Sequence, residues 1–126
     1  MILLKFVYIG LGGFFGAIGR YSISKWVANK YSSSFPYGTL VVNLIGSFLL
    51  GFLLTYFLDK STLRPIYRTA IATGFLGALT TFSTFGFETI VLFEEESYRL
   101  AFFNIFSNLI LGLMLVFIGI KIAKLI

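Results

Sequence analysis

Four long apolar runs, separated by short charged or turn-forming stretches, dominate the chain. They cover roughly residues 3–25, 37–58, 66–93 and 98–124. A helix of about 20 residues crosses the hydrocarbon core of a bilayer, which is about 30 Å thick. The pattern therefore predicts an all-α integral membrane protein with four transmembrane helices in one domain spanning residues 1–126. Between the first two helices, the aromatics, serines and proline of Trp26–Tyr37 predict an interfacial loop.

The third run departs from a plain lipid-facing helix in its middle. Glycines stand at Gly74 and Gly77, and the β-branched Thr80 and Thr81 follow. Both residue types weaken a regular helix, so the sequence predicts a break near residues 75–81. A break inside a membrane exposes backbone carbonyls and amides, which then need an ion, a water molecule or another chain as partner.

Aromatic and hydroxyl side chains follow the predicted break. Phe82 and Phe85 lie three residues apart and share a helical face, while Ser83 and Thr84 turn hydroxyls toward a neighbouring face. Two interpretations stay open. Either the helix is merely kinked, with its rings facing lipid and its hydroxyls bonded to the preceding turn, or these side chains line a narrow path.

Polar stripes also run along the second and fourth predicted helices. Their members recur at helical spacing and cannot prefer lipid: Thr39, Asn43, Gly46 and Ser47 in the second helix, and Asn104, Ser107, Asn108 and Gly112 in the fourth. Near the middle of its span, the Asn43 amide is either an interhelical hydrogen-bond clamp or a donor in a pore. Three polar stripes, counting the third helix, predict a shared interior.

Two charged side chains lie within or beside apolar runs. Arg20 comes near the end of the first helix, where it either snorkels to the headgroups or places a cation at the mouth of an anion path. Glu88 lies one turn beyond Phe85, where it either pairs with a cation such as Arg20 or faces a wet vestibule. In the first helix, the spacing of Gly12 and Gly16 predicts close backbone packing against a neighbour.

Composition supports a membrane protein and argues against catalysis. Of the 126 residues, 58% are hydrophobic and 12% are charged, and the mean hydropathy is +0.95. The chain has no cysteine and no histidine, which removes thiolate chemistry, the usual general base and the commonest metal ligands. The net charge of +5 does not indicate nucleic-acid binding, because the basic residues stand at the ends of apolar runs, as in loops beside lipid headgroups.

The basic residues are divided almost evenly between the two predicted membrane faces. Six lie on the side of the termini and four on the other: Lys5, Lys60, Arg64, Arg68, Lys121 and Lys124 against Arg20, Lys25, Lys30 and Arg99. So small a bias does not fix one orientation, so we expect insertion both ways and an antiparallel pair. Four short helices also form a bundle too thin to enclose an aqueous path, which again favours an oligomer.

Taken together, these motifs make the chain resemble the CrcB/Fluc family of fluoride ion channels. The resemblance covers nearly the whole chain and rests on three blocks: Gly12 to Arg20, Gly38-Thr39 through Asn43 to Gly46-Ser47, and Gly74-Phe75-Leu76-Gly77 with Thr80-Thr81-Phe82-Ser83-Thr84-Phe85 and Glu88. The Thr-Thr-Phe-Ser-Thr-Phe run inside a third transmembrane segment is the most specific of these motifs. The fourth helix matches the family more freely.

The resemblance implies a dual-topology, antiparallel homodimer in the cell inner membrane. Two antiparallel pores would carry fluoride passively out of the cytoplasm, and a structural Na⁺ would lie at the dimer centre. The implied sodium ligands are the backbone carbonyls of Gly77 and Thr80. The implied pore residues are Phe82 and Phe85 as pore phenylalanines, Asn43 as the pore amide, Ser83 and Thr84 as a polar track, Arg20 as a vestibule cation, and Thr39, Ser107, Asn108 and Glu88 as further lining candidates.

Two functions of other classes compete with this hypothesis. A small four-helix, dual-topology, proton-coupled exporter needs a membrane-embedded carboxylate near mid-helix, yet the first helix has no acidic residue and Glu88 lies close to a helix end. A non-transporting assembly protein would explain the glycines as packing residues. It would leave three polar stripes and a broken helix without a purpose.

Overall fold

The computed structural model describes residues 1–60 and 63–126, and these residues form four helical segments of membrane-spanning length. The segments are α1 (Ile2–Lys30), α2 (Tyr37–Lys60), a third segment over Pro65–Glu94 and a fourth over Tyr98–Leu125. This confirms the predicted all-α architecture with four spans. The interfacial loop is shorter than predicted, because α1 continues to Lys30 and buries Val27 in its last turns.

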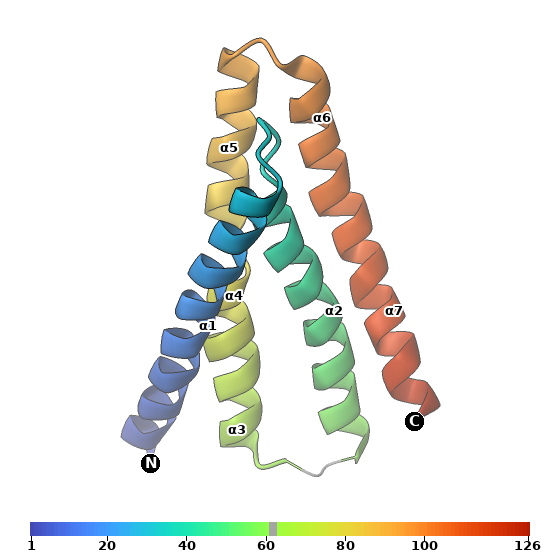
Figure 1. Cartoon of the computed structure of the whole chain (residues 1–126). Coiled ribbons are helices and arrows are strands. Elements are labelled where there is room, and N and C mark those ends of the chain that lie inside the picture. Colours follow the sequence, from blue (N-terminus) through green and yellow to red (C-terminus); the bar gives the residue numbers. More distant parts are fainter. Residues whose placement is uncertain (61–62) are drawn as a thin grey trace.

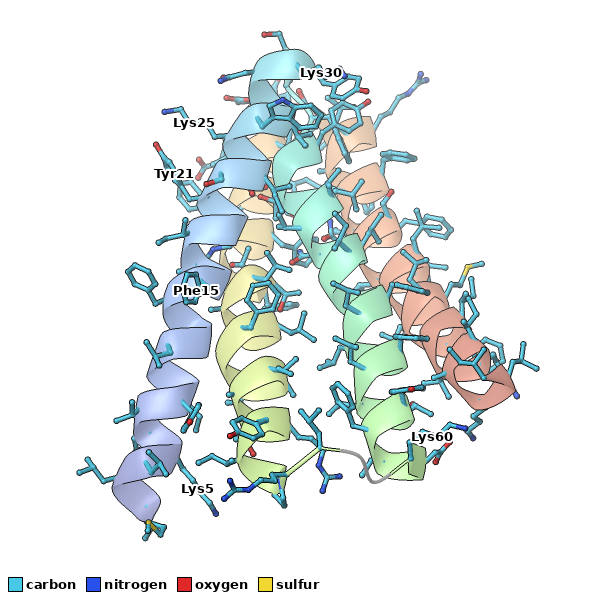
Figure 2. The ribbon with its side chains drawn as sticks, turned by 60° about the horizontal axis from the view of Figure 1, so that its bottom comes forward. Lys5, Phe15, Tyr21, Lys25, Lys30 and Lys60 are labelled. Atoms are coloured by element: carbon cyan, nitrogen blue, oxygen red, sulfur yellow. The ribbon has the colours of Figure 1, made fainter. Side chains whose placement is uncertain are left out.

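Figure 1 shows both termini, the end of α2 and the start of α3 at one end of the bundle, and the turns after α1 and α5 at the other. The same division separates the labelled lysines in Figure 2, where Lys5 and Lys60 lie at one end and Lys25 and Lys30 at the other. Lysines near helix ends reach the headgroup region along apolar stems. The predicted division of these four lysines between two ends of the bundle is therefore confirmed.

The third segment consists of four helical pieces. They are α3 (Pro65–Thr69), the π-helical η1 (Ala70–Leu76), α4 (Gly77–Leu79) and α5 (Phe82–Glu94). Between α4 and α5 the backbone is extended, with φ −85° and ψ 156° at Thr80 and φ −150° and ψ 117° at Thr81. The break therefore lies at the C-terminal end of the predicted range 75–81, at the β-branched residues Thr80 and Thr81.

The glycines of the third segment have a different role from the predicted one. Gly77 is helical, and Gly74 lies inside η1. A Cβ on Gly74 would stand 3.2 Å from Gly12 Cα, so this glycine allows α1 to approach closely. From the α1 side, a Cβ on Gly12 would overlap the Ala70 carbonyl, and one on Gly16 would overlap the Phe75 carbonyl. This contact confirms the small-residue packing predicted for α1.

The fourth segment is continuous and lies against α2. It comprises α6 (Tyr98–Phe106), the π-helical η2 (Ser107–Leu111) and α7 (Gly112–Leu125). At the α2–α7 contact, a Cβ on Gly51 would overlap the Val116 carbonyl. Between these packed pairs the fully apolar core is small and centres on Val42, Leu76 and Leu79. Many other apolar side chains face outward, where a bilayer or another chain can cover them.

Candidate functional site

The second extended residue of the break, Thr81, is held by one side chain of α2. The Thr81 backbone N–H donates to Asn43 Oδ1 at 2.8 Å, and Asn43 Nδ2 donates back to the Thr81 carbonyl at 3.1 Å. The carboxamide thus pairs with both backbone groups of Thr81, as a neighbouring strand would. This is the interhelical clamp that was one of two interpretations of Asn43, and its role toward an ion stays a prediction.

Thr81 also begins the next helix. Its Oγ1 accepts from the Thr84 backbone N–H at 3.1 Å and donates to Thr84 Oγ1 at 3.0 Å, and Ser83 Oγ lies 3.3 Å away. A threonine hydroxyl in this position is a standard N-cap, and it satisfies an amide that the new helix leaves free. The cap gathers three hydroxyls at the break, and those of Ser83 and Thr84 belong to exposed residues.

The hydrogen bonds donated by the Thr81 and Thr84 backbone amides leave two backbone carbonyls without their helical donors. In a continuous helix, the Thr81 and Thr84 amides would donate to the carbonyls of Gly77 and Thr80, four residues earlier. Here they donate to Asn43 Oδ1 and Thr81 Oγ1 instead. The two carbonyls therefore lose their helical donors and need another partner. Residues 1–60 and 63–126 contain no group of three His, Cys, Asp or Glu side chains placed to hold a metal ion.

A cavity of about 270 Å³ opens beside the break, and we call it the break cavity. It brings together six of the predicted site residues: Asn43, Gly77, Thr80, Phe82, Phe85 and Asn108. Gly46 and Ser47 from the predicted polar stripe of α2 line it too. The sequence therefore placed these residues on helix faces that do converge.

The two phenylalanines differ in their surroundings. Their ring centroids lie 5.4 Å apart with an angle of 59° between the planes, so neither ring stacks on the other. Phe85 is buried at 6% exposure, whereas Phe82 is 76% exposed. Although their spacing predicts a shared helical face, the Phe85 ring lies inside the chain and the Phe82 ring projects outward from it.

A second cavity, of about 570 Å³, lies toward the end of the bundle that carries Lys25 and Lys30, and we call it the end cavity. Four further predicted site residues line it: Arg20, Thr39, Thr84 and Glu88. Thr81 lines both cavities. The N-cap of α5 therefore contributes to the walls of both cavities.

Glu88 is held by a neighbouring helix rather than by a cation. Its Oε1 accepts from Thr39 Oγ1 at 2.8 Å, and its Oε2 is buried without a hydrogen-bond partner within the described chain. Arg20 lines the same cavity, but no ion pair joins the two side chains in the part of the chain that the structure describes. Within the described residues, Glu88 is therefore bonded to Thr39 and not to Arg20.

The two predicted site residues of the fourth segment, Ser107 and Asn108, lie in different surroundings. Asn108 lines the break cavity, and its Oδ1 accepts from Asn43 Nδ2 at 2.8 Å. Ser107 is buried, with 1% exposure, and it lines neither cavity. Its hydroxyl has no hydrogen-bond partner among the described residues. Asn108 thus joins the site, and Ser107 lies outside it.

Comparison with known proteins places this arrangement in a family. The sequence model described as "CrcB-like protein, Camphor Resistance (CrcB)" matches residues 7–120. The chain belongs to the CrcB-like family. The match includes the first three spans from Val7 onward and nearly all of the fourth, so every candidate site residue falls within it.

Individual CrcB-like relatives cover almost the full length of the chain. Three proteins named "Fluoride-specific ion channel FluC" are similar to it. The one from a Nitratiruptor species is 47% identical over 92% of this chain and 89% of its own. The one from a Geobacter species is 44% identical over 95% and 97%, and the one from Hahella chejuensis is 46% identical over 95% and 94%. These relatives are named as ion channels and not as enzymes.

Some residues of this CrcB-like site were not singled out from the sequence. Thr81 was interpreted only as a helix-weakening residue, although a threonine just before a restarting helix is a favoured N-cap and could have indicated the role. Helical spacing identifies Asn104 only as a member of a polar stripe, and no sequence pattern points to Thr89. Both are buried and bonded to each other, at 2.9 Å between Asn104 Nδ2 and Thr89 Oγ1.

Proposed function

We propose that this chain forms a fluoride-selective channel that lets fluoride leave the cytoplasm passively and so relieves its toxicity. The observation that carries the proposal is the broken third segment, where two phenylalanine rings meet hydroxyl and amide donors at mid-membrane. The names of the relatives support fluoride as the ion. We place the channel in the cell inner membrane, since export from the cytoplasm requires that location.

The side chains at the break suit a small, strongly hydrated anion. The edge of a phenyl ring carries partial positive charge, so ring edges can face an anion that ring faces would repel. Hydroxyls of Ser83 and Thr84 can replace part of the hydration shell without holding the ion too tightly to release it. Arg20 in the end cavity would attract anions toward the path. Thr39 and Glu88 would line the same entrance.

We further propose that the functional unit is an antiparallel homodimer with two pores. The break cavity is open at the side of the chain, where polar groups of Asn43, Ser47 and Asn108 would otherwise meet lipid at mid-membrane. Polar groups in hydrocarbon are unfavourable, so a second copy is a better cover than acyl chains. The outward ring of Phe82 would then project toward the partner. The small difference in basic residues between the two ends favours both orientations.

A structural Na⁺ at the dimer centre fits the free backbone acceptors. The carbonyls of Gly77 and Thr80 lie at the break cavity and have lost their helical donors to Asn43 and Thr81. Hard cations favour oxygen ligands, and neutral carbonyls avoid burying negative charge at the same place. Two such breaks, related by the two-fold axis of a dimer, would supply a symmetric set.

The proposal is tested by fluoride efflux from proteoliposomes that contain the purified protein. We expect fluoride to leave down its gradient with chloride retained and with no proton gradient imposed. Efflux that requires a proton gradient would favour the small exporter instead. Protein-free vesicles are the control, and equal permeation of chloride would contradict a fluoride-selective channel.

Replacing either phenylalanine of the break with isoleucine tests the aromatic pore. Isoleucine is apolar and nearly as large but has no ring quadrupole, so fluoride efflux should fall while the protein still elutes as a dimer. Phe82→Ile is the cleaner variant for the fold of the subunit, because Phe82 is 76% exposed in the single chain and its replacement leaves no void inside that chain. Full efflux from both variants would mean that these rings face lipid or packing partners only.

Dual topology is tested with a single cysteine, since the chain has none of its own. Tyr31 follows the last residue of α1, is 55% exposed and carries no charge, so Tyr31→Cys leaves the distribution of basic residues unchanged. We expect a membrane-impermeant maleimide to label part of the population in intact cells, and the rest only after the membrane is opened. Complete labelling from one side would establish a single orientation and contradict the antiparallel pair.

A further inference from the structure

A row of buried polar side chains connects α5 to the break through the fourth segment. It begins at the Phe85 carbonyl, which accepts from Thr89 Oγ1 at 2.7 Å. Thr89 Oγ1 in turn accepts from Asn104 Nδ2 at 2.9 Å. Asn104 Oδ1 then accepts from Asn108 Nδ2 at 2.9 Å, and the Asn104 backbone carbonyl accepts from the same nitrogen at 3.0 Å.

The row continues into the clamp already described. Asn108 Oδ1 accepts from Asn43 Nδ2 at 2.8 Å, and Asn43 holds both backbone groups of Thr81. The two ends of the row, Phe85 and Thr81, are separated by about one turn of the same helix. The hydrogen bonds therefore form a closed loop that passes through three transmembrane segments.

One hydroxyl and two backbone groups, the Asn104 carbonyl and the Thr81 N–H, set the direction of every bond in this loop. Thr89 has a single hydroxyl hydrogen, which it donates to the Phe85 carbonyl, so it can only accept from its other neighbour. Asn104 must then turn its NH₂ group toward Thr89 and its oxygen toward Asn108. Asn108 consequently presents its oxygen to Asn43, whose NH₂ group faces it.

Reversing the side-chain amide of Asn104 or Asn108 would disturb the hydrogen bonds that hold Thr81. If Asn108 turned its NH₂ group toward Asn43, two donors would face each other. Asn43 could relieve this only by rotating its own amide, which would set its NH₂ group against the Thr81 N–H. The extended conformation of Thr81, and with it the release of the Gly77 carbonyl, depends on the present orientation.

Burial places the two remote members of the row outside any ion path. Asn104 has 0% exposure and Thr89 has 5%, and neither side chain lines the break cavity or the end cavity. A buried polar group in a membrane protein without a partner is disfavoured, so this pair needs its hydrogen bonds satisfied internally. Any influence of this pair on transport must therefore pass through the groups that it bonds, which are Asn108 on one side and the Phe85 carbonyl on the other.

We propose that Thr89 and Asn104 are positioning residues that fix the orientation of the Asn108 and Asn43 amides and thereby hold the break open at Thr81. The loop Phe85–Thr89–Asn104–Asn108–Asn43–Thr81 carries this inference. It rests on the proposed function only in so far as transport is one of its readouts.

Two substitutions at Thr89 separate orientation from packing. Thr89→Val keeps the shape and loses the hydroxyl, whereas Thr89→Ser keeps the hydroxyl and loses a methyl group. We expect valine to lower fluoride efflux by about tenfold, the factor that an unpaired buried amide would produce, and serine to retain efflux near that of the unchanged protein. A packing role predicts the opposite order, because serine leaves a void in a buried site and valine does not.

A second readout does not depend on transport. The side-chain amide signals of Asn43 can be followed by ¹⁵N NMR of the full chain in detergent and identified by their loss in Asn43→Ala. We expect them to shift or broaden in Thr89→Val and to stay in place in Thr89→Ser. Thr89 is linked to Asn43 through Asn104 and Asn108 on one side and through Phe85 and one turn of α5 on the other, so such a shift reports that the loop couples the two residues.

The outcomes distinguish the inference from the proposed function. Absence of fluoride efflux from the unchanged protein would contradict the proposed function, and the NMR comparison would still decide the relay. Unchanged Asn43 signals in Thr89→Val, or a larger loss of efflux in the serine variant than in the valine variant, would overturn the positioning role. If Thr89→Val does not yield a monodisperse protein, Asn104→Leu is measured in its place, and wild-type signals in that variant would overturn the inference equally.

Discussion

Replacing Gly16 with alanine is expected to abolish both the monodisperse dimer and fluoride efflux. A Cβ at this position would overlap the Phe75 carbonyl and stand 3.0 Å from Ala78 Cβ. Backbone atoms of a helix cannot rotate away as a side chain would, so α1 would have to move off η1. Overpacking typically costs about 1–3 kcal/mol, and in a bilayer close backbone contact is itself a main source of helix association.

The chain offers a matched control for this substitution. Gly10 lies six residues earlier in α1, and a Cβ there would have nothing within 4 Å. Gly10→Ala should therefore leave size-exclusion profile and efflux unchanged, since alanine is the better helix former by about 1 kcal/mol. The measurements are the elution profile, the thermal stability in detergent and the efflux rate. A stable, conducting Gly16→Ala protein would mean that α1 does not pack on η1 as described.

The second large effect is expected for Asn43→Asp, which should lower fluoride efflux by at least about tenfold. A carboxylate has no hydrogen to donate, so its oxygen would replace Nδ2 opposite two acceptors, the Thr81 carbonyl and Asn108 Oδ1. Leaving a buried polar group unpaired costs about 1–3 kcal/mol, and about 1.4 kcal/mol corresponds to a factor of ten. The substitution would disturb the break whether or not the amide also contacts fluoride.

Asn43→Ala provides the graded comparison. It removes both donors and the acceptor, but Asn43 lines the break cavity, so water can reach the groups left behind. We therefore expect alanine to reduce efflux less than aspartate does. The measurement is the fluoride efflux rate of the unchanged protein, Asn43→Asp and Asn43→Ala, each first shown to be a dimer by size exclusion. Normal conduction by the aspartate variant would show that the clamp on Thr81 is dispensable for transport.

The close match of the predicted spans has a simple physical basis. Hydrocarbon tolerates no unpaired backbone, so apolar runs of this length must be helical, and their ends follow from the charged residues that flank them. The main error, at Trp26–Lys30, occurred where aromatic and basic residues suit an interface equally well as loop or helix. Sequence also located the break to within a few residues, because β-branched threonines adjoin each other there.

The candidate site was predictable as a set of residues but not as a set of bonds. Helical spacing placed Asn43 and Asn108 on polar faces, and the two do meet. Spacing could not show that Asn43 occupies both backbone groups of Thr81, because that pairing depends on the register between α2 and the break. Nor could it separate Ser107 from Asn108, which are adjacent in sequence and differ only in the direction in which the helix turns them.

The sequence by itself determined a four-helix membrane protein with a weak point in its third span and polar faces on three helices. Those properties follow from local composition and from the period of the helix. Only the tertiary structure decided which polar groups pair, since each donor is assigned by its distance to a neighbour from another segment. The glycines show the same division. Their spacing predicted a close helix contact, but only the packed helices show that Gly74 allows α1 to approach η1 and that the helix breaks at Thr80 and Thr81.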